Sequence, residues 1–296
     1  MGITAKIQVN LLRILKGHKQ AVYSICSGRN GVIYTAGGDG FIVKWNPLDS
    51  DNGIVVATVP EPIYTMECNK KSDVLYVGSQ SGYLYEIQNG NARKIEAHSR
   101  GLYSILLADS GLITVGGDGK LIQWNEELNQ KASKQLSKKA LRKIISIPGG
   151  FAVGGSEGLV FLLSLEFNIW DQWDNHGSTV FALEFEQETK RIFYGGRDAL
   201  IHQRDILQGN EAEIKAHLLH IHDLKLAPDN SVLASASMDK TIKIWDTKSF
   251  DLLKVLDANK FGIHTSSVNA LVWINPSTLV AVSDDRNVGV FEILRN

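Results

Sequence analysis

Short runs of apolar or alternating residues recur along the whole chain and are separated by turns. In the first copy of this pattern the runs are Val22–Ile25, Val32–Thr35, Phe41–Trp45 and Gly53–Val59. The Gly-Asp-Gly sequence at 38–40 stands between two of these runs, which is typical of a tight hairpin turn. The sequence contains no segment of ten or more residues with a helical period, so the runs predict β-strands.

The pattern returns with a fixed internal spacing. In three copies an acidic residue precedes a tryptophan by six positions, at Asp39 and Trp45, Asp118 and Trp124, and Asp239 and Trp245. Four weaker copies keep that spacing, at Ser81 and Ile87, Glu157 and Leu163, Asp198 and Arg204, and Asp285 and Phe291. The ends of successive copies are 37 to 46 residues apart. Four short strands per copy predict an all-β ring of seven four-stranded antiparallel sheets.

The last copy supplies only three strands, at Val268–Trp273, Thr278–Val282 and Val288–Ile293. The run at 11–15 near the N-terminus has no partner within its own copy and alternates in the manner of a strand. We therefore predict that an N-terminal strand, residues 6–16, completes the seventh sheet. This pairing would close the ring and remove an open sheet edge.

These residues resemble the WD-repeat (WD40) family of β-propellers from about Leu11 to Phe291. Gly17-His18 and Trp245-Asp246 match the family signature, while Trp45-Asn46 and Trp124-Asn125 depart from it conservatively. The resemblance implies a single seven-bladed propeller over residues 1–296. Its blades would lie at roughly 18–59, 60–97, 98–136, 137–174, 175–215, 216–257 and 258–296.

The resemblance also implies a hydrogen-bond relay of His, Ser or Thr, Asp and Trp inside a blade, which would satisfy buried polar groups. Three blades carry the full set: His18/Thr35/Asp39/Trp45, His98/Thr114/Asp118/Trp124 and His217/Ser235/Asp239/Trp245. Blades two and four lack it, so we expect apolar packing alone to hold them. His176 and His264 recur with the repeat and are interpreted as structural.

Charge and composition narrow the possible functions. Lys and Arg number 31 against 32 Asp and Glu, and this balance argues against a dedicated DNA-binding protein. Two cysteines cannot build a disulfide framework, and no apolar run is long enough to cross a bilayer. The first six residues lack the apolar segment of a secretory signal. We expect a cytoplasmic protein, with the nucleus possible in a eukaryote.

One basic run leaves a second function open. It contains Lys131, Lys134, Lys138, Lys139, Arg142 and Lys143. It could be a solvated strand and loop, or a patch for nucleic acid or phosphate. The even overall charge lowers the nucleic-acid alternative.

Catalytic or metal chemistry has little support in the sequence. The Gly-rich turns at 37–40 and 116–119 lack the following helix that phosphate binding requires, and no cofactor is expected. His220 and His222 would share one face of a strand, and Asp223 would face the other way. This pair is a remote candidate for a metal site, because zinc needs three or four converging ligands. The expected protein is not an enzyme.

The first strand of each blade would line a central channel, by the same resemblance, and its opening residues would lie at the rim of one face. Family members such as the G-protein β subunit commonly bind partners there. The candidate partner-binding residues are Tyr23, Tyr64, Tyr103, Arg142, Phe181, Arg197, His222 and Met238. Tyr, Arg and Met are enriched at protein interfaces. The alternative is that the three tyrosines only pack the channel wall.

Overall fold

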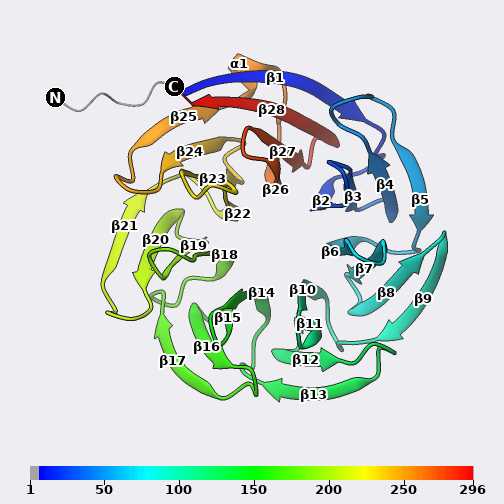
Figure 1. Ribbon diagram of the computed structural model, residues 1–296, viewed down its shortest axis with the longest axis vertical. Coiled ribbons are helices and arrows are strands. Elements are labelled where there is room, and N and C mark those ends of the chain that lie inside the picture. The colour runs from blue at the N-terminus through cyan, green and yellow to red at the C-terminus, as the bar shows by residue number, and fades with distance from the viewer. Residues whose placement is uncertain (1–6, 296) are drawn as a thin grey trace.

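The computed structural model describes residues 7–295. Seven four-stranded antiparallel sheets stand as blades around a central axis (Figure 1). In each blade the first strand lies nearest the axis and the last strand lies at the periphery (Figure 1). The prediction of a seven-bladed, all-β propeller is confirmed.

Blades 1 to 3 follow one another along the chain. Their strands are β2 (Val22–Ser27), β3 (Ile33–Gly37), β4 (Phe41–Trp45) and β5 (Ile54–Thr58); β6 (Ile63–Asn69), β7 (Val74–Ser79), β8 (Tyr83–Gln88) and β9 (Asn91–Glu96); and β10 (Leu102–Ala108), β11 (Gly111–Gly116), β12 (Lys120–Trp124) and β13 (Gln130–Gln135).

Blades 4 to 6 keep the same order. Their strands are β14 (Leu141–Ile147), β15 (Gly150–Gly155), β16 (Leu159–Ser164) and β17 (Ile169–Asp174); β18 (Val180–Glu186), β19 (Arg191–Gly196), β20 (Leu200–Asp205) and β21 (Glu211–Lys215); and β22 (Ile221–Leu226), β23 (Val232–Ser237), β24 (Ile242–Asp246) and β25 (Leu252–Leu256).

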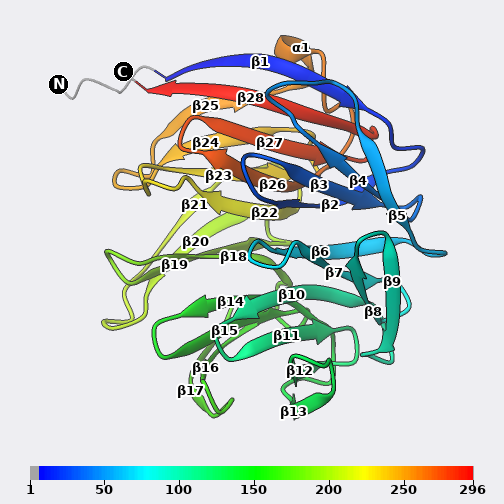
Figure 2. The ribbon, with the colours of Figure 1, turned by 45° about the vertical axis from the view of Figure 1, so that its right-hand side comes forward.

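Blade 7 joins the two ends of the described chain. It contains β26 (Val268–Asn275), β27 (Thr278–Ser283), β28 (Asn287–Arg295) and, as its outer strand, β1 (Ile7–Lys16). β1 runs antiparallel to β28, from Ile7 opposite Arg295 to Lys16 opposite Asn287. Both ribbon views show β1 lying along β28 (Figures 1 and 2). The predicted closure is confirmed, and Lys6, which the predicted strand included, lies outside the described residues.

The hydrophobic core is divided into seven clusters, and each cluster fills the space between two neighbouring blades. Between blades 7 and 1, for example, Leu15, Val22, Trp45 and Val280 pack together. The second strands are buried along nearly their full length, whereas outer strands such as β5 are largely exposed. Burying a large apolar side chain contributes roughly 1.5–3 kcal/mol, so these interfaces stabilise the ring.

The turn between the second and third strands needs a left-handed residue directly after the acidic anchor. Gly40 fills this position in blade 1 with φ 71°, and Lys240 adopts φ 71° in blade 6. A Cβ at Gly40 would lie 2.2 Å from the carbonyl oxygen of Val59, so a side chain there requires the backbone to move. Among residues 7–295 the only helix is α1 (Ala258–Phe261), which lies in the connection from blade 6 to blade 7 and was not predicted.

Candidate functional site

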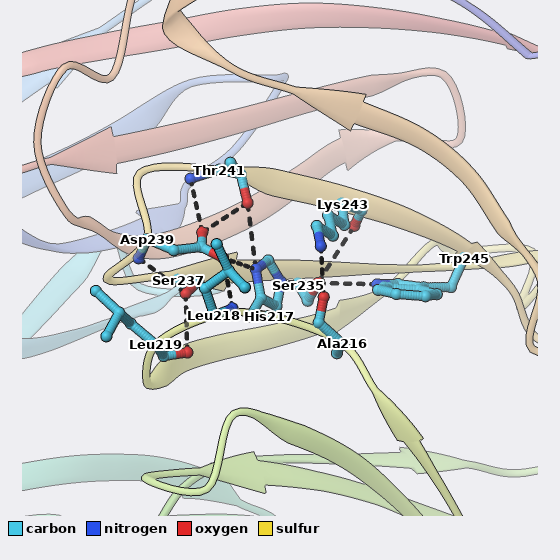
Figure 3. A network of polar contacts seen from close by, with 10 residues as sticks. All are labelled: Ala216, His217, Leu218, Leu219, Ser235, Ser237, Asp239, Thr241, Lys243 and Trp245. Carbon is cyan, nitrogen blue, oxygen red and sulfur yellow. Dashed lines mark hydrogen bonds and ion pairs between the residues drawn. The ribbon is translucent and has the colours of Figure 1, made fainter.

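A chain of polar contacts crosses blade 6 from the rim to the outer part of the sheet (Figure 3). His217 Nδ1 lies 2.9 Å from Asp239 Oδ2, and its Nε2 lies 2.7 Å from Ser235 Oγ. Trp245 Nε1 donates to the same hydroxyl oxygen at 2.9 Å. The hydroxyl can therefore accept from the indole and donate to Nε2 of a neutral histidine whose Nδ1–H faces the carboxylate.

Blades 1 and 3 repeat this arrangement. Their histidine Nε2 to hydroxyl distances are 2.8 Å (His18, Thr35) and 2.9 Å (His98, Thr114). The indoles of Trp45 and Trp124 donate to the same hydroxyls at 2.7 and 3.0 Å, and His18 and His98 face Asp39 and Asp118 at 3.1 and 2.9 Å.

Protonation in these relays follows from burial and hydrogen bonding. Burial lowers the pKa of His18 and His217, which keeps both rings neutral. Burial alone would raise the pKa of Asp118, but the hydrogen bond from His98, the charge of His98 and the backbone amides of Lys120 and Ser99 together lower that pKa. In blade 6, hydrogen bonds from His217 and Thr241 lower the pKa of Asp239 despite its burial, so this relay pairs a neutral imidazole with an ionised carboxylate.

In blades 2 and 4, which lack the full relay, other hydrogen bonds to a carboxylate take its place, and these were not predicted from the sequence. In blade 2, Glu61 accepts from the Tyr85 hydroxyl at 2.7 Å and from the Ser81 amide at 3.1 Å. In blade 4, the Ser137 hydroxyl donates to Glu157 at 2.8 Å. The expectation that apolar packing alone holds these blades is wrong, because Glu61 satisfies the turn of blade 2 from another position and Glu157, at the acidic position of blade 4, bonds to Ser137.

Blades 5 and 7 modify the relay in different ways. In blade 5, buried Asn175 and His202 both bond to Asp198, at 2.8 and 3.0 Å, while His176 is exposed. The structural interpretation of His176 is therefore wrong. In blade 7, His264 is buried at the relay position, but neither ring nitrogen has a hydrogen-bond partner among the described residues.

The first strands enclose a central channel with a cavity of about 180 Å³ and a wider mouth of about 380 Å³ at one end. Each first strand has an irregular register after its opening residue, as between Val22 and Ser24. This β-bulge turns two successive side chains toward the channel. Asp223 therefore lines the channel together with His222, and the expectation that it faces the other way is wrong.

Three tyrosines from blades 1 to 3 contact one another at the mouth. The rings of Tyr23 and Tyr64 meet edge-on with centroids 5.8 Å apart, and those of Tyr64 and Tyr103 stack at 5.7 Å. Burial raises the pKa of Tyr23 and of Tyr64, so both hydroxyls stay protonated at neutral pH. All three side chains remain partly exposed.

The series of contacts continues around the rest of the mouth. The Arg142 guanidinium lies 4.1 Å from the Tyr103 ring centroid and 5.7 Å from that of Phe181. Phe181 meets His222 edge-on at 6.1 Å. Asn269 of blade 7 then donates to the Val22 carbonyl of blade 1 at 2.8 Å. One residue from each blade, directly after the opening residue of its first strand, thus forms a mouth ring: Tyr23, Tyr64, Tyr103, Arg142, Phe181, His222 and Asn269.

Arg197 and Met238 occupy turns around this ring. Their backbone amides donate to Thr179 and His220, the residues just before β18 and β22, which places both turns at the mouth. Met238 is 43% exposed, and the neighbouring connection adds Leu218 at 88% and Leu219 at 46%. Blade 6 therefore presents an exposed apolar sector at the rim.

Deeper in the channel lies a charged cluster that the sequence analysis did not identify. It consists of Glu67, Lys143, Glu184, Asp223 and Lys225. Lys225 pairs with Glu184, and Asp223 accepts from the Leu271 amide at 3.0 Å. The Lys225 ammonium, followed by burial, lowers the pKa of Lys143, and burial raises the pKa of Glu67. The sequence signal for this cluster was the presence of charged residues on first strands that are otherwise largely apolar.

The structure gives little support to the two alternative sites, which are the basic run at 131–143 and the metal candidate at His220 and His222. The basic run divides between outer strand β13, the exposed connection at 138–139, the mouth ring and the channel, so it forms no single patch. His222 Nδ1 lies 3.3 Å from the Val268 carbonyl. Within residues 7–295, no group of three or more His, Cys, Asp or Glu side chains could hold a metal ion.

Comparisons with known proteins agree with this architecture. Residues 9–46 and 210–246 match the model of the WD40 family (WD domain, G-beta repeat). The serine-threonine kinase receptor-associated proteins of Homo sapiens and Bos taurus are 22% identical over 250 residues, covering 80% of this chain and 71% of theirs. WD repeat-containing protein 1 of Gallus gallus is 23% identical, covering 96% of this chain and 48% of that protein.

A solved structure shows the same fold over nearly the whole chain. The WD40 β-propeller domain of Doa1 aligns with a TM-score of 0.87 and 18% identity, covering 96% of this chain and 97% of that one. The propeller fold, the two matched repeats and the WD-repeat relatives together support assignment to the WD-repeat β-propellers. Propellers of this family are typically platforms for protein interactions. No helix among the described residues is long and apolar enough to cross a membrane.

Proposed function

We propose that the protein is a non-catalytic platform that binds a peptide or a protein surface over the mouth of the central channel. The observation that carries this proposal is the mouth ring. Its seven side chains are partly exposed, and most of them contact their neighbours around the channel. Tyrosine and arginine in such a setting supply large contact areas and are enriched among binding hot spots.

The contacts within the ring support binding rather than oppose it. Stacking fixes the orientation of Tyr64 between its two neighbours, and Tyr103 holds the guanidinium of Arg142. A partner would therefore meet side chains whose rotamers are already restricted, so little further conformational entropy is lost on binding. Channel packing and partner contact are compatible roles for the same residues.

The test is affinity capture from the native cell with wild-type protein and the double variant Tyr64→Ala/Arg142→Ala. The matched control is Trp170→Ala, because Trp170 is 48% exposed on the outer strand of blade 4. We expect one or a few proteins to be lost with the double variant and kept with the control, when all three proteins melt alike. Capture that is unchanged by the double variant would contradict the proposal.

We also propose the cytoplasm as the compartment. Cys26 and Cys68 are both buried free thiols, and burial raises the pKa of each. Neutral buried thiols are unreactive and suit a reducing compartment.

A further inference from the structure

Arg142 combines a fixed geometry with unused hydrogen-bonding capacity. Its Nε donates to Ser156 Oγ at 2.8 Å, and its guanidinium lies over the Tyr103 ring. Over residues 7–295 no carboxylate oxygen lies within ion-pair distance of it, and its two terminal nitrogens make no hydrogen bond. A held guanidinium with free N–H groups at a partly open mouth is suited to an anion, because its fork matches two carboxylate oxygens.

The rim on both sides of Arg142 adds positive charge. Arg100 of blade 3, Lys138 and Lys139 of blade 4, and Arg197 of blade 5 are exposed and form no ion pair within the described chain. The acidic residues in the turns of the same three blades are hydrogen-bonded, Asp118 to His98, Glu157 to Ser137, and Asp198 to Asn175 and His202. Arg142 and the four exposed basic side chains outnumber these turn carboxylates, so this sector of the rim is basic although the whole protein carries a net charge of −1.

The apolar sector of blade 6 lies next to this basic sector. Phe181 links them, because its ring contacts both the Arg142 guanidinium and the ring of His220, with centroids 6.1 Å apart in the second case. His220 directly follows exposed Leu218 and Leu219. A bound segment could thus reach a basic and an apolar sector at once.

We propose that the mouth binds an acidic segment of a partner polypeptide, with an Asp or Glu carboxylate on the guanidinium of Arg142 and an apolar side chain on blade 6. This inference rests on the proposed platform function and adds the chemistry of the partner. Positive charge around the site would also steer an acidic segment toward it, an effect that salt weakens.

The test uses random dodecapeptides displayed on phage and selected on the immobilised wild-type protein. Selected peptides are synthesised with fluorescein, and their affinities are measured by anisotropy for wild type, Arg142→Gln, Arg142→Lys and Tyr64→Ala. Arg93→Gln is the matched control, because Arg93 lies on outer strand β9 away from the mouth. Thermal melting of every variant shows that it is folded.

We expect the selected peptides to be enriched in Asp and Glu beside an apolar residue. Arg142→Gln should weaken them about ten- to hundredfold, since a charged hydrogen-bonding group is lost. Arg142→Lys should keep part of the affinity, because it retains the charge but not the planar fork. Replacing the peptide's Asp or Glu by the amide should cost as much in wild type and nothing further in Arg142→Gln.

Two results would overturn the inference. If Tyr64→Ala weakens the selected peptides but they lack acidic residues and tolerate Arg142→Gln, the platform function stands and the anion site does not. If no selected peptide responds to Tyr64→Ala or to Arg142→Gln, both proposals are contradicted.

Discussion

At the scale of single residues, the hydroxyl of each complete relay serves two buried ring nitrogens at once. Thr35 is fully buried, and its Oγ1 lies 2.8 Å from His18 Nε2 and 2.7 Å from Trp45 Nε1. Removing that oxygen leaves both nitrogens without a partner in a dry interior. The cost of an unsatisfied buried group exceeds the net contribution of one hydrogen bond.

We therefore predict that Thr35→Val destabilises the protein by about 2–4 kcal/mol, although its shape is nearly unchanged. Ala281 occupies the equivalent position in blade 7, beside the unpartnered His264. Ala281→Ser should stabilise the protein by about 1 kcal/mol, by offering that ring a hydroxyl. Urea unfolding measures both changes. A neutral Thr35→Val would show that the relay is not a stabilising element.

Buried histidines also predict how stability depends on pH. Burial lowers the pKa of His264 to about 4, although Asp285 acts in the opposite direction, whereas a histidine in the unfolded chain titrates near 6.5. Between these values the unfolded state binds more protons, so stability is full above about pH 6.5 and falls as pH drops toward 4. The whole window corresponds to about 3 kcal/mol.

Urea unfolding of wild type and His264→Phe at pH 7 and pH 5 tests this prediction. Both proteins should lose stability on acidification, because His18 and His217 shift in the same direction, and the variant should lose less. Equal losses would mean that His264 does not contribute.

At the scale of elements, β1 fills the position of the missing fourth strand in blade 7. It pairs along β28 and buries Leu15 completely, while Leu12 on the same strand is 43% exposed. Without β1, the edge of β28 would be open and part of the core between blades 7 and 1 would lie in water.

Deleting residues 1–16 should therefore lower the melting temperature of the whole propeller by about 10 °C or more, because several kcal/mol of packing are lost. Leu15→Ala should cost about 2–5 kcal/mol, and the matched change Leu12→Ala much less. Unchanged melting of the truncated protein would show that the ring does not depend on this closure.

The elements and their order were predictable because alternation, turn glycines and the Asp-to-Trp spacing are local signals. The bulge that opens each first strand was not, since it depends on pairing with the second strand, and this is why Asp223 was placed on the wrong face. The contacts of Glu61 with Tyr85 were missed because they join residues far apart in the repeat. His176 followed the spacing of the repeat, yet its neighbour Asn175 takes the buried position.

At the scale of the whole molecule, seven inter-blade clusters and the pairing of β1 with β28 hold the seven blades in fixed positions relative to one another. Each blade contributes one side chain to the mouth, so a partner lying there would contact many blades without any blade moving. The ring brings together Tyr23, Arg142 and His222, which are far apart in the sequence. The position of these residues at the mouth was predictable from the repeat. Which of them contact one another depends on the closed ring and was not predictable.

The most direct test of the platform is photo-crosslinking in the native cell. The photoreactive residue benzoyl-phenylalanine replaces Tyr103 at the mouth in one variant and Trp170 on the outer strand of blade 4 in another. We predict that irradiation attaches a discrete partner polypeptide to the Tyr103 variant and not to the Trp170 variant. Crosslinks from position 170 alone would contradict the account, as would a folded Tyr103 variant that captures no polypeptide.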